Sequence, residues 1–497
     1  MEIQELINKL NELEQLQYAY RYAMGITNFD GNTVAPKNSY KARGQAMAIL
    51  SGETYKKFIN EEVKELLFSL KENEKQLDFT TLRKVDEYID EYEKTSKIPM
   101  NEFMEYTKLQ SDSNHAWEQA KANNDFKGFA PYLEKMFEFN KRFANYRNPE
   151  KKPYNVHLDD FEKGMEMDDI DKFFNQLKKD VVPLIKDAVN ESKGIREDFL
   201  ERPFPVDKQK ELSSLLTDVL KMDKDNFIIA ESEHPFTMGL NNFDVRFTTH
   251  YYENMIASSF YSTMHEAGHA IYGLNHDLKY NGTVLSGGAS NGVHESQSRF
   301  YENLVGRSKQ FINYIYPTMK NLFPDQLSDV SANEFYRAVN KPKLSLIRIE
   351  ADELTYSLHI MVRYEIERMM FEEKVNVNDL PAIWNSKYEE YLGITPPNDT
   401  KGVLQDVHWA FGLIGYFPSY ALGSAYASQF LSKMKETVSF DSDVAKGDFS
   451  NINAWLKDNI QIHGAVYTPK QLIERVCNEP FNPKYYADYL KGKFSDL

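Results

Sequence analysis

The segment 256–274 carries apolar side chains at the spacing of an amphipathic α-helix. At about 100° per residue, six of them fall within roughly 80° of one another: Ile256, Phe260, Met264, Ala267, Ile271 and Leu274. His265 and His269 fall on roughly the opposite side of the same helix. The pattern therefore predicts a helix that packs one face against a core and presents its histidines to a different space, as a helix beside a cleft does.

Helical spacing elsewhere, and a shortage of turn-forming residues, favour a mostly α-helical fold. The chain has 23 Gly and 19 Pro among 497 residues, fewer than the usual shares of roughly 7% and 5%. A sandwich or barrel needs more turns than this. The best strand signal is the run 245–249, Val-Arg-Phe-Thr-Thr. We expect one mostly helical domain over residues 1–497, with a small strand element before residue 250.

Charge and cysteine content exclude several classes of protein. Lys and Arg number 59 and Asp and Glu 75, so the formal net charge is −16, and such a surface repels nucleic acids. The single cysteine, Cys477, cannot form an internal disulfide, which fits a reducing compartment. We find no secretory signal and no uncharged apolar stretch long enough to span a membrane. We therefore expect a cytoplasmic protein without nucleic-acid or membrane partners.

Residues 265–269 read His-Glu-Ala-Gly-His, the HExxH pattern of a metal site on a helix. Positions i and i+4 share one face, so His265 and His269 can bind one ion. Zn²⁺ suits imidazole ligands and tetrahedral geometry. Glu266 lies about 100° round the helix, close enough to act on a water molecule at the metal. The pattern predicts a zinc site in which Glu266 is the catalytic base.

A catalytic zinc site needs a third protein ligand and one position left for water. Glu295 lies 295 − 269 = 26 residues after His269, which allows a loop and a return helix and favours Glu295 as that ligand. His294 is the alternative ligand. A different interpretation of Glu295 is an exposed ion pair with Arg299 at positions i and i+4.

Six short motifs stand in series along the chain. They are His234-Pro235-Phe236, Asp244-Val245-Arg246-Phe247-Thr248, His265-Glu266-Ala267-Gly268-His269, His294-Glu295-Ser296-Gln297, Ile347-Arg348-Ile349-Glu350-Ala351-Asp352 and Gly402-Val403-Leu404-Gln405-Asp406-Val407-His408-Trp409. In this order, and over essentially the whole chain, they resemble the carboxypeptidase Taq family of zinc metallopeptidases, most closely its bacterial members. HExxH alone is moderately specific, whereas six motifs in order are very specific.

The resemblance implies an all-helical, bilobed body around a long deep groove, with a short sheet beside it. It implies His265, His269 and Glu295 as zinc ligands and Glu266 as the catalytic carboxylate. It also implies a cytoplasmic homodimer that removes residues one at a time from peptide C-termini. Such enzymes accept many side chains, tend to stall at proline, and often retain activity when Co²⁺ replaces Zn²⁺.

The oxyanion formed during peptide hydrolysis needs hydrogen-bond donors besides the metal, and His408 and Tyr420 are our candidates. His408 lies in the run Gln-Asp-Val-His-Trp. If that run is extended, Asp406 and His408 point the same way, and Asp406 orients the imidazole. Tyr420 ends a run with Gly and Pro, which indicates a loop near the groove. Tyr416 is the nearest alternative.

An exopeptidase must also bind a free α-carboxylate, for which the planar fork of arginine is best suited. Arg348 is our choice because the resemblance places it in a family motif. An ion pair with Asp352 at i+4 on one helix is the alternative. His234 and Asp406 complete the set of candidate substrate-binding residues.

Two other functions fit part of the pattern. An oligo-endopeptidase or dipeptidyl exopeptidase would share the zinc chemistry and differ in how it holds the end of the substrate. A non-enzymatic helical scaffold with a chance HExxH would lack stoichiometric metal. The motifs around Arg348 and at 405–409 favour the carboxypeptidase.

Asp244 and Arg246 could equally form a local structural pair beside the groove.

Overall fold

The computed structural model describes residues 2–372, 374–495 and 497. Helices dominate it, and a small sheet lies beside the HExxH helix, which confirms the predicted fold class. The helices before the sheet are α1 (Ile3–Asn32), α2 (Tyr40–Phe58), α3 (Glu61–Glu72), α4 (Phe79–Ser96), α5 (Met100–Asn123), α6 (Phe126–Arg147), α7 (Pro153–Phe161), α8 (Met167–Asp180), α9 (Val182–Glu191) and α10 (Val206–Val219). The strands are β1 (Phe227–Glu231), β2 (Thr237–Asn241) and β3 (Asp244–Thr249). The helices after the sheet are α11 (Ile256–Asn275), α12 (Asn291–Arg299), α13 (Lys309–Leu322), α14 (Pro324–Leu327), α15 (Ala332–Val339), α16 (Glu353–Phe371), α17 (Leu380–Leu392), α18 (Phe417–Met434), α19 (Phe440–Lys446), α20 (Ser450–Asn459), α21 (Pro469–Cys477) and α22 (Lys484–Ser495).

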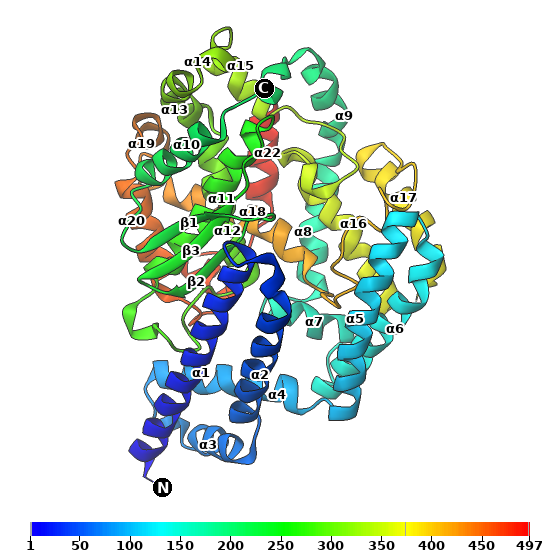
Figure 1. The fold of residues 1–497 in the computed structure, drawn as a ribbon, viewed down its shortest axis with the longest axis vertical. Helices are drawn as coiled ribbons and strands as arrows, with labels where there is room; N and C mark the ends of the chain where they lie inside the picture. Colours follow the sequence, from blue (N-terminus) through cyan, green and yellow to red (C-terminus); the bar gives the residue numbers. More distant parts are fainter. Residues whose placement is uncertain (1, 373, 496) are drawn as a thin grey trace.

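Figure 1 shows the helices gathered into two groups. One group surrounds the sheet and contains α10, α13–α15, α19 and α20, whereas the other contains α5, α6, α16 and α17. Helices α8 and α18 lie between the two groups, and α1–α4 form the end of the molecule near the N-terminus. Helices α1, α3 and α4 bury an apolar cluster of their own, separate from the main core, which extends from Ala120 to Phe494. The single domain over residues 1–497 remains a prediction.

The sheet has the strand order β1-β3-β2. β3 is central, parallel to β1 and antiparallel to β2, and Phe227 pairs with Val245. Val245 and Phe247 are fully buried, and Val245 packs against Gly273 on α11. The strand predicted at 245–249 is thus confirmed as β3, and its apolar face supports the helix that carries the two histidines.

Helix α11 has the predicted amphipathic form. Ile256, Met264 and Ala267 are fully buried, and they belong to the main core. The side chains of His265 and His269 keep 18% and 17% of their surface exposed. Helical periodicity therefore identified both faces correctly, since it depends only on spacing within one element.

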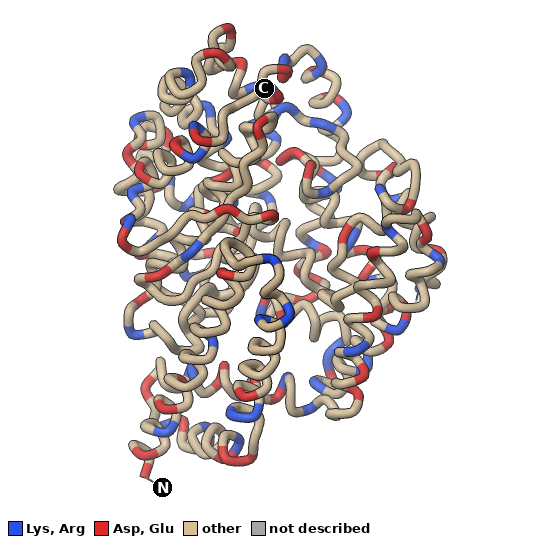
Figure 2. Tube along the Cα trace, in the orientation of Figure 1, with Lys and Arg blue, Asp and Glu red and all other residues tan. Residues whose placement is uncertain are grey.

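Acidic and basic residues are interspersed along the whole Cα trace in Figure 2. Many of them pair between elements, as Lys163 does with Glu87 (2.9 Å) and Lys470 with Asp169 (2.6 Å). The excess of 16 negative charges is thus spread over the molecule in this view. Among the described helices, none has both the length and the apolar composition required to cross a bilayer.

Candidate metal centre

Three potential metal ligands meet where α12 packs against α11. The Nε2 atoms of His265 and His269 lie 3.6 and 3.5 Å from the same atom, Oε2 of Glu295. Tetrahedral zinc ligands at about 2.0–2.1 Å from the metal are about 3.3 Å apart. The three ligand atoms, all within 4.8 Å of one another, therefore have a spacing that fits a single zinc ion.

Two glycines allow α12 to lie this close to its neighbours. A Cβ at Gly268 of α11 would lie 2.5 Å from the carbonyl oxygen of Gln297. A Cβ at Gly423 of α18 would overlap the side chain of Glu295. Only glycine at both positions lets α12 pass between α11 and α18 and bring Glu295 to the histidines.

The carboxylate of Glu162 holds the N-terminal end of α12. It accepts hydrogen bonds from the backbone N–H of Gly292 and from Oγ of Ser290 at 2.8 Å. It also accepts from two hydroxyls of α18, Ser419 at 2.9 Å and Tyr426 at 3.4 Å. Burial raises the pKa of Glu162 to about 7. Glu162 therefore ties α12 to α18 entirely through neutral groups.

Outer hydrogen bonds orient both histidines. Nδ1 of His265 lies 2.8 Å from Oε2 of Glu302, and Nδ1 of His269 lies 2.7 Å from Nδ1 of His294. Each contact leaves the Nε2 atom facing Glu295, which is the arrangement that metal-binding histidines use. His294, the alternative third ligand, thus lies behind His269 instead of joining the three ligand atoms.

The carboxylate of Glu295 is shared between the histidines and Arg299. Its Oε1 accepts a hydrogen bond from Nε of Arg299 at 2.7 Å, while Oε2 accepts one from Ser298 at 3.0 Å and faces the histidines. The ion pair with Arg299, considered as the alternative interpretation of Glu295, does form, but it is buried, since the side chains of Glu295 and Arg299 are only 9% and 14% exposed. Arg299 also donates to Glu302 at 2.9 Å, so it links Glu295 to the hydrogen-bond partner of His265.

The pocket attracts positive charge. Burial opposes ionisation of Glu295, but Arg299 and the two histidines hold the pKa of this carboxyl well below its usual range. Burial also opposes a charge on His265, but Glu295 and Glu302 outweigh it and raise the pKa of His265 to about 9. A divalent cation supplies the charge that this pocket favours. Two imidazoles and one carboxylate are also the donor set of many catalytic zinc sites.

Glu266 lies next to His265 on α11 and is held by β2. Its side chain is buried, and the hydroxyl of Thr237 donates a hydrogen bond to its Oε2 at 2.6 Å. Sequence reasoning missed Thr237, because it is 29 residues from Glu266 and no local spacing connects the two. The one available signal is its position directly after the motif at 234–236.

His408 and Tyr420 lie side by side, with Nε2 of His408 3.4 Å from the Tyr420 hydroxyl. The rings of Tyr416 and Tyr420 are 5.1 Å apart. The extended conformation considered for residues 405–409 is wrong, because residues 401–412 form a succession of turns. Oδ1 of Asp406 lies 4.0 Å from Nδ1 of His408, beyond hydrogen-bonding distance. Asp406 therefore does not orient the imidazole as expected.

Asp406 instead joins two arginines. Arg348 donates to its Oδ1 at 2.8 Å, and Arg363 donates to its Oδ2 at 2.6 Å. The alternative pair of Arg348 with Asp352 does not form, because Asp352 caps α16 by accepting the N–H of Leu354 at 2.9 Å. Two arginines beside one aspartate leave a net positive charge, which suits one substrate carboxylate. Sequence analysis did not single out Arg363.

Tyr356 connects this group to the metal cluster. Its hydroxyl accepts a hydrogen bond from Nη1 of Arg348 at 3.3 Å. Its ring lies under the guanidinium of Arg299, 4.6 Å from the ring centre, and Arg299 in turn holds Glu295. The proposed ligands and Arg348 therefore belong to one connected site. Nothing in the sequence distinguishes Tyr356 from the other tyrosines, of which the chain has 31 in all.

Three other motif positions, His234, Asp244 and Arg246, lie in or beside the sheet. The side chain of His234, in the connection between β1 and β2, is exposed, and its carbonyl accepts a hydrogen bond from Ser232 at 2.7 Å. Among the described residues, no hydrogen bond links its ring to the metal cluster. Arg246 and Asp244 form the local pair considered from the sequence, with bonds of 2.9 and 2.8 Å.

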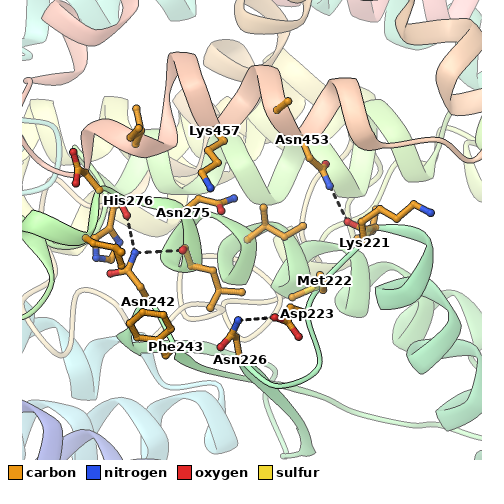
Figure 3. Close-up of a pocket in the computed structure, with 17 residues that line it drawn as sticks. Lys221, Met222, Asp223, Asn226, Asn242, Phe243, Asn275, His276, Asn453 and Lys457 are labelled. Atoms are coloured by element: carbon orange, nitrogen blue, oxygen red, sulfur yellow. Dashed lines mark hydrogen bonds between the residues drawn. The ribbon is translucent and has the colours of Figure 1, made fainter.

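A pocket of about 620 Å³ lies at the C-terminal end of α11 (Figure 3). None of the three proposed ligands is among its lining residues. Nδ2 of Asn242 donates to the carbonyl oxygens of His276 at 2.6 Å and Leu274 at 3.3 Å. These bonds satisfy carbonyl groups at the end of the helix. We therefore interpret the pocket as part of the support of α11 and place the chemistry at the histidine face.

Comparison with known proteins covers almost the whole chain. The family model described as Carboxypeptidase Taq (M32) metallopeptidase matches residues 9–494. Carboxypeptidase 1 of Bacillus subtilis is 44% identical over 479 residues, and thermostable carboxypeptidase 1 of Pyrococcus furiosus is 34% identical over 486 residues. Each match covers 96% of both chains. The crystal structure of the M32 carboxypeptidase from Deinococcus radiodurans R1 gives a TM-score of 0.96 at 35% identity and covers 99% of both chains.

Proposed function

The chain belongs to the carboxypeptidase Taq (M32) family of metallopeptidases and is a metallocarboxypeptidase, and from that premise we propose that it is a zinc enzyme that releases single amino acids in turn from peptide C-termini. His265, His269 and Glu295 would hold the zinc ion, which Co²⁺ can replace. The observation that carries the proposal is the approach of both Nε2 atoms to one oxygen of Glu295, at 3.6 and 3.5 Å.

A zinc ion in this site would polarise the scissile carbonyl and lower the pKa of a water molecule to about 7. Glu266 takes a proton from the attacking water and later passes it to the leaving amine. The hydrogen bond from Thr237 at 2.6 Å holds the Glu266 carboxylate in one orientation for both transfers.

His408 and Tyr420 donate hydrogen bonds to the oxyanion. Their polar atoms lie 3.4 Å apart, so both can converge on one substrate oxygen. Burial lowers the pKa of His408 to about 4, so a neutral imidazole is the donor at pH 7. One preorganised donor of this kind is worth about 10²–10³ in rate. Tyr416 remains the alternative to Tyr420.

Arg348 binds the α-carboxylate of the substrate. Asp406 is its counterion and fixes its guanidinium, while Arg363 on the other side of Asp406 restores the net positive charge. An amidated C-terminus removes the negative charge that this pocket recognises. His234, which is exposed, remains a candidate contact for the outer part of a bound peptide.

Three further properties are proposed from the family resemblance. The enzyme accepts many C-terminal side chains and stalls at proline, whose rigid ring lacks a backbone N–H. It acts in the cytoplasm, since its single cysteine is buried and unpaired and such usage fits a reducing compartment. It is a homodimer, which light scattering in solution tests directly.

Mass spectrometry of one unblocked peptide and its C-terminal amide, each with and without a chelator, tests the function. We expect successive single-residue losses from the free acid only, abolished by the chelator and restored by Zn²⁺. Internal cuts in both peptides would make the protein an endopeptidase. Absence of cleavage in every metal condition would contradict the proposal altogether.

A further inference from the structure

Glu367, on α16, is a buried carboxyl group that no step of the proposed reaction uses. Its side chain is fully buried. Oε1 accepts a hydrogen bond from Nε1 of Trp409 at 2.7 Å. Oε2 accepts one from the backbone N–H of Gly415 at 2.9 Å and one from the hydroxyl of Tyr154 at 2.7 Å. Two of these three donors therefore belong to the loop between α17 and α18.

All three donors are neutral. Arg363 lies one turn earlier on α16, but its guanidinium donates to Asp406 (2.6 Å), to Gln405 (2.7 Å) and to the carbonyl of His359 (2.6 Å). Burial raises the pKa of Glu367 to about 7. A buried carboxyl group without a paired cation is costly for stability. Glu367 therefore does not serve stability by its charge, and its role lies in the groups that its hydrogen bonds hold in place.

The two loop donors lie directly beside His408, a proposed oxyanion donor, and beside Tyr416, the alternative to Tyr420. Trp409 follows His408 in the chain, and Gly415 precedes Tyr416. The intervening loop consists largely of turns, which set the direction of a side chain less firmly than a helix does. Glu367 thus fixes the loop at two points, one beside His408 and the other beside Tyr416, whose ring lies 5.1 Å from that of Tyr420.

We propose that Glu367 is a positioning residue that holds His408 in the orientation required at the oxyanion and holds Tyr416 beside Tyr420. The inference rests on the function proposed above for His408 and its neighbouring tyrosines. Glu367 touches neither the substrate nor the metal in this scheme and acts only through the loop. A shift of about 1 Å in a catalytic group, caused by a change at a distance, can slow a reaction by 10²-fold.

Glutamine at position 367 keeps the size of the side chain but cannot keep both loop contacts. If its amide nitrogen takes the place of Oε1, it faces the N–H of Trp409. If the nitrogen takes the place of Oε2, it faces the N–H of Gly415. A donor then meets a donor in either orientation, so one of the two contacts is lost.

Steady-state hydrolysis of a free-acid peptide by zinc-loaded Glu367→Gln tests the proposal. We expect kcat to fall about 10- to 100-fold, with KM changed less than about twofold. Tyr154→Phe is the matched control, because it removes the third donor without touching the loop, and it should stay near wild type. Because Oε2 accepts two of the hydrogen bonds and Oε1 only one, we expect the amide nitrogen to replace Oε1 and to lose the Trp409 contact. Trp409→Phe should then lower kcat similarly, and combining it with Glu367→Gln should add little, since both variants break the same contact.

Wild-type kcat in Glu367→Gln, or an equal loss in Tyr154→Phe, would overturn the positioning role. Loss of bound zinc, or a rise in KM as large as the fall in kcat, would do so too, because the effect would then lie at another part of the site. His408→Ala separates this inference from the proposed function. If His408→Ala is slow and Glu367→Gln is not, only the inference fails. If His408→Ala keeps wild-type kcat, the role of His408 fails and the inference fails with it.

Discussion

Nδ1 of His269 lies 2.7 Å from Nδ1 of His294, so one imidazole donates a hydrogen bond to the other. A metal ligand at Nε2 of His269 requires its proton on Nδ1, which makes His294 the acceptor. The ring of His294 is itself held 5.0 Å from that of Tyr272. The residue considered as an alternative ligand therefore has a geometry suited to orienting a ligand.

Replacement of His294 by Phe should weaken zinc binding about 10- to 100-fold, because the ring of His269 loses the acceptor that sets its tautomer and orientation. Competition with a chromogenic chelator measures the affinity. His115→Ala, at an exposed position on α5, is the control and should bind zinc as wild type does. Unchanged affinity in His294→Phe would show that the contact does not support the metal site.

Glu266→Gln should retain one zinc ion per chain and lose about 10²–10⁴-fold in turnover, since a neutral amide cannot accept a proton from water. Elemental analysis gives the zinc content and peptide hydrolysis gives the turnover, both on the same sample. Glu233→Gln, at an exposed position before β2, is the matched control. Near-normal hydrolysis by the Glu266 variant would remove this residue from the mechanism.

Arg348→Ala should raise KM for free-acid peptides about 10- to 100-fold, the loss expected when hydrogen bonds to a charged group are removed. Arg142→Ala, whose side chain is 45% exposed, serves as the control. In Arg348→Ala, Asp406 is still paired with Arg363, so we expect the loop that carries Asp406 to stay folded. Thermal unfolding of both variants checks this. Unchanged KM for the Arg348 variant would exclude it from carboxylate binding.

The buried carboxyl of Glu162 should make stability depend on pH. Burial raises its pKa from 4.5 to about 7, so between these values the folded protein holds a proton that the unfolded chain has released. The free energy of unfolding therefore falls as pH rises through this window, by about 3 kcal/mol from this group.

Glu162→Gln should remove this dependence. Three of the four donors to Glu162 are hydroxyls, which can turn to meet an amide nitrogen. Urea unfolding at pH 5 and pH 8 should show the variant gaining stability relative to wild type at the higher pH. Glu72→Gln, at an exposed position on α3, should follow wild type at both values. Parallel behaviour of Glu162→Gln and wild type would contradict the raised pKa.

Where sequence reasoning about the site was wrong, it assumed local geometry that the chain does not adopt. Asp406 and His408 were expected to point the same way along an extended segment, but turns at 401–412 place Asp406 between Arg348 and Arg363. Glu302, Thr237 and Tyr356 were missed because each reaches the site from another element. Partners far apart in the chain leave no periodic signal.

The sequence alone determined the helical class, the two faces of α11 and, through six ordered motifs, the family. These follow from spacing within one or two turns and from residue types, which are properties of short segments. The tertiary structure alone decided that His294 lies behind His269, that Asp406 joins two arginines, and that Thr237 holds Glu266. The physical reason is that these contacts depend on how closely whole helices pack, as α12 does between Gly268 of α11 and Gly423 of α18, and close packing depends on burial across the entire chain.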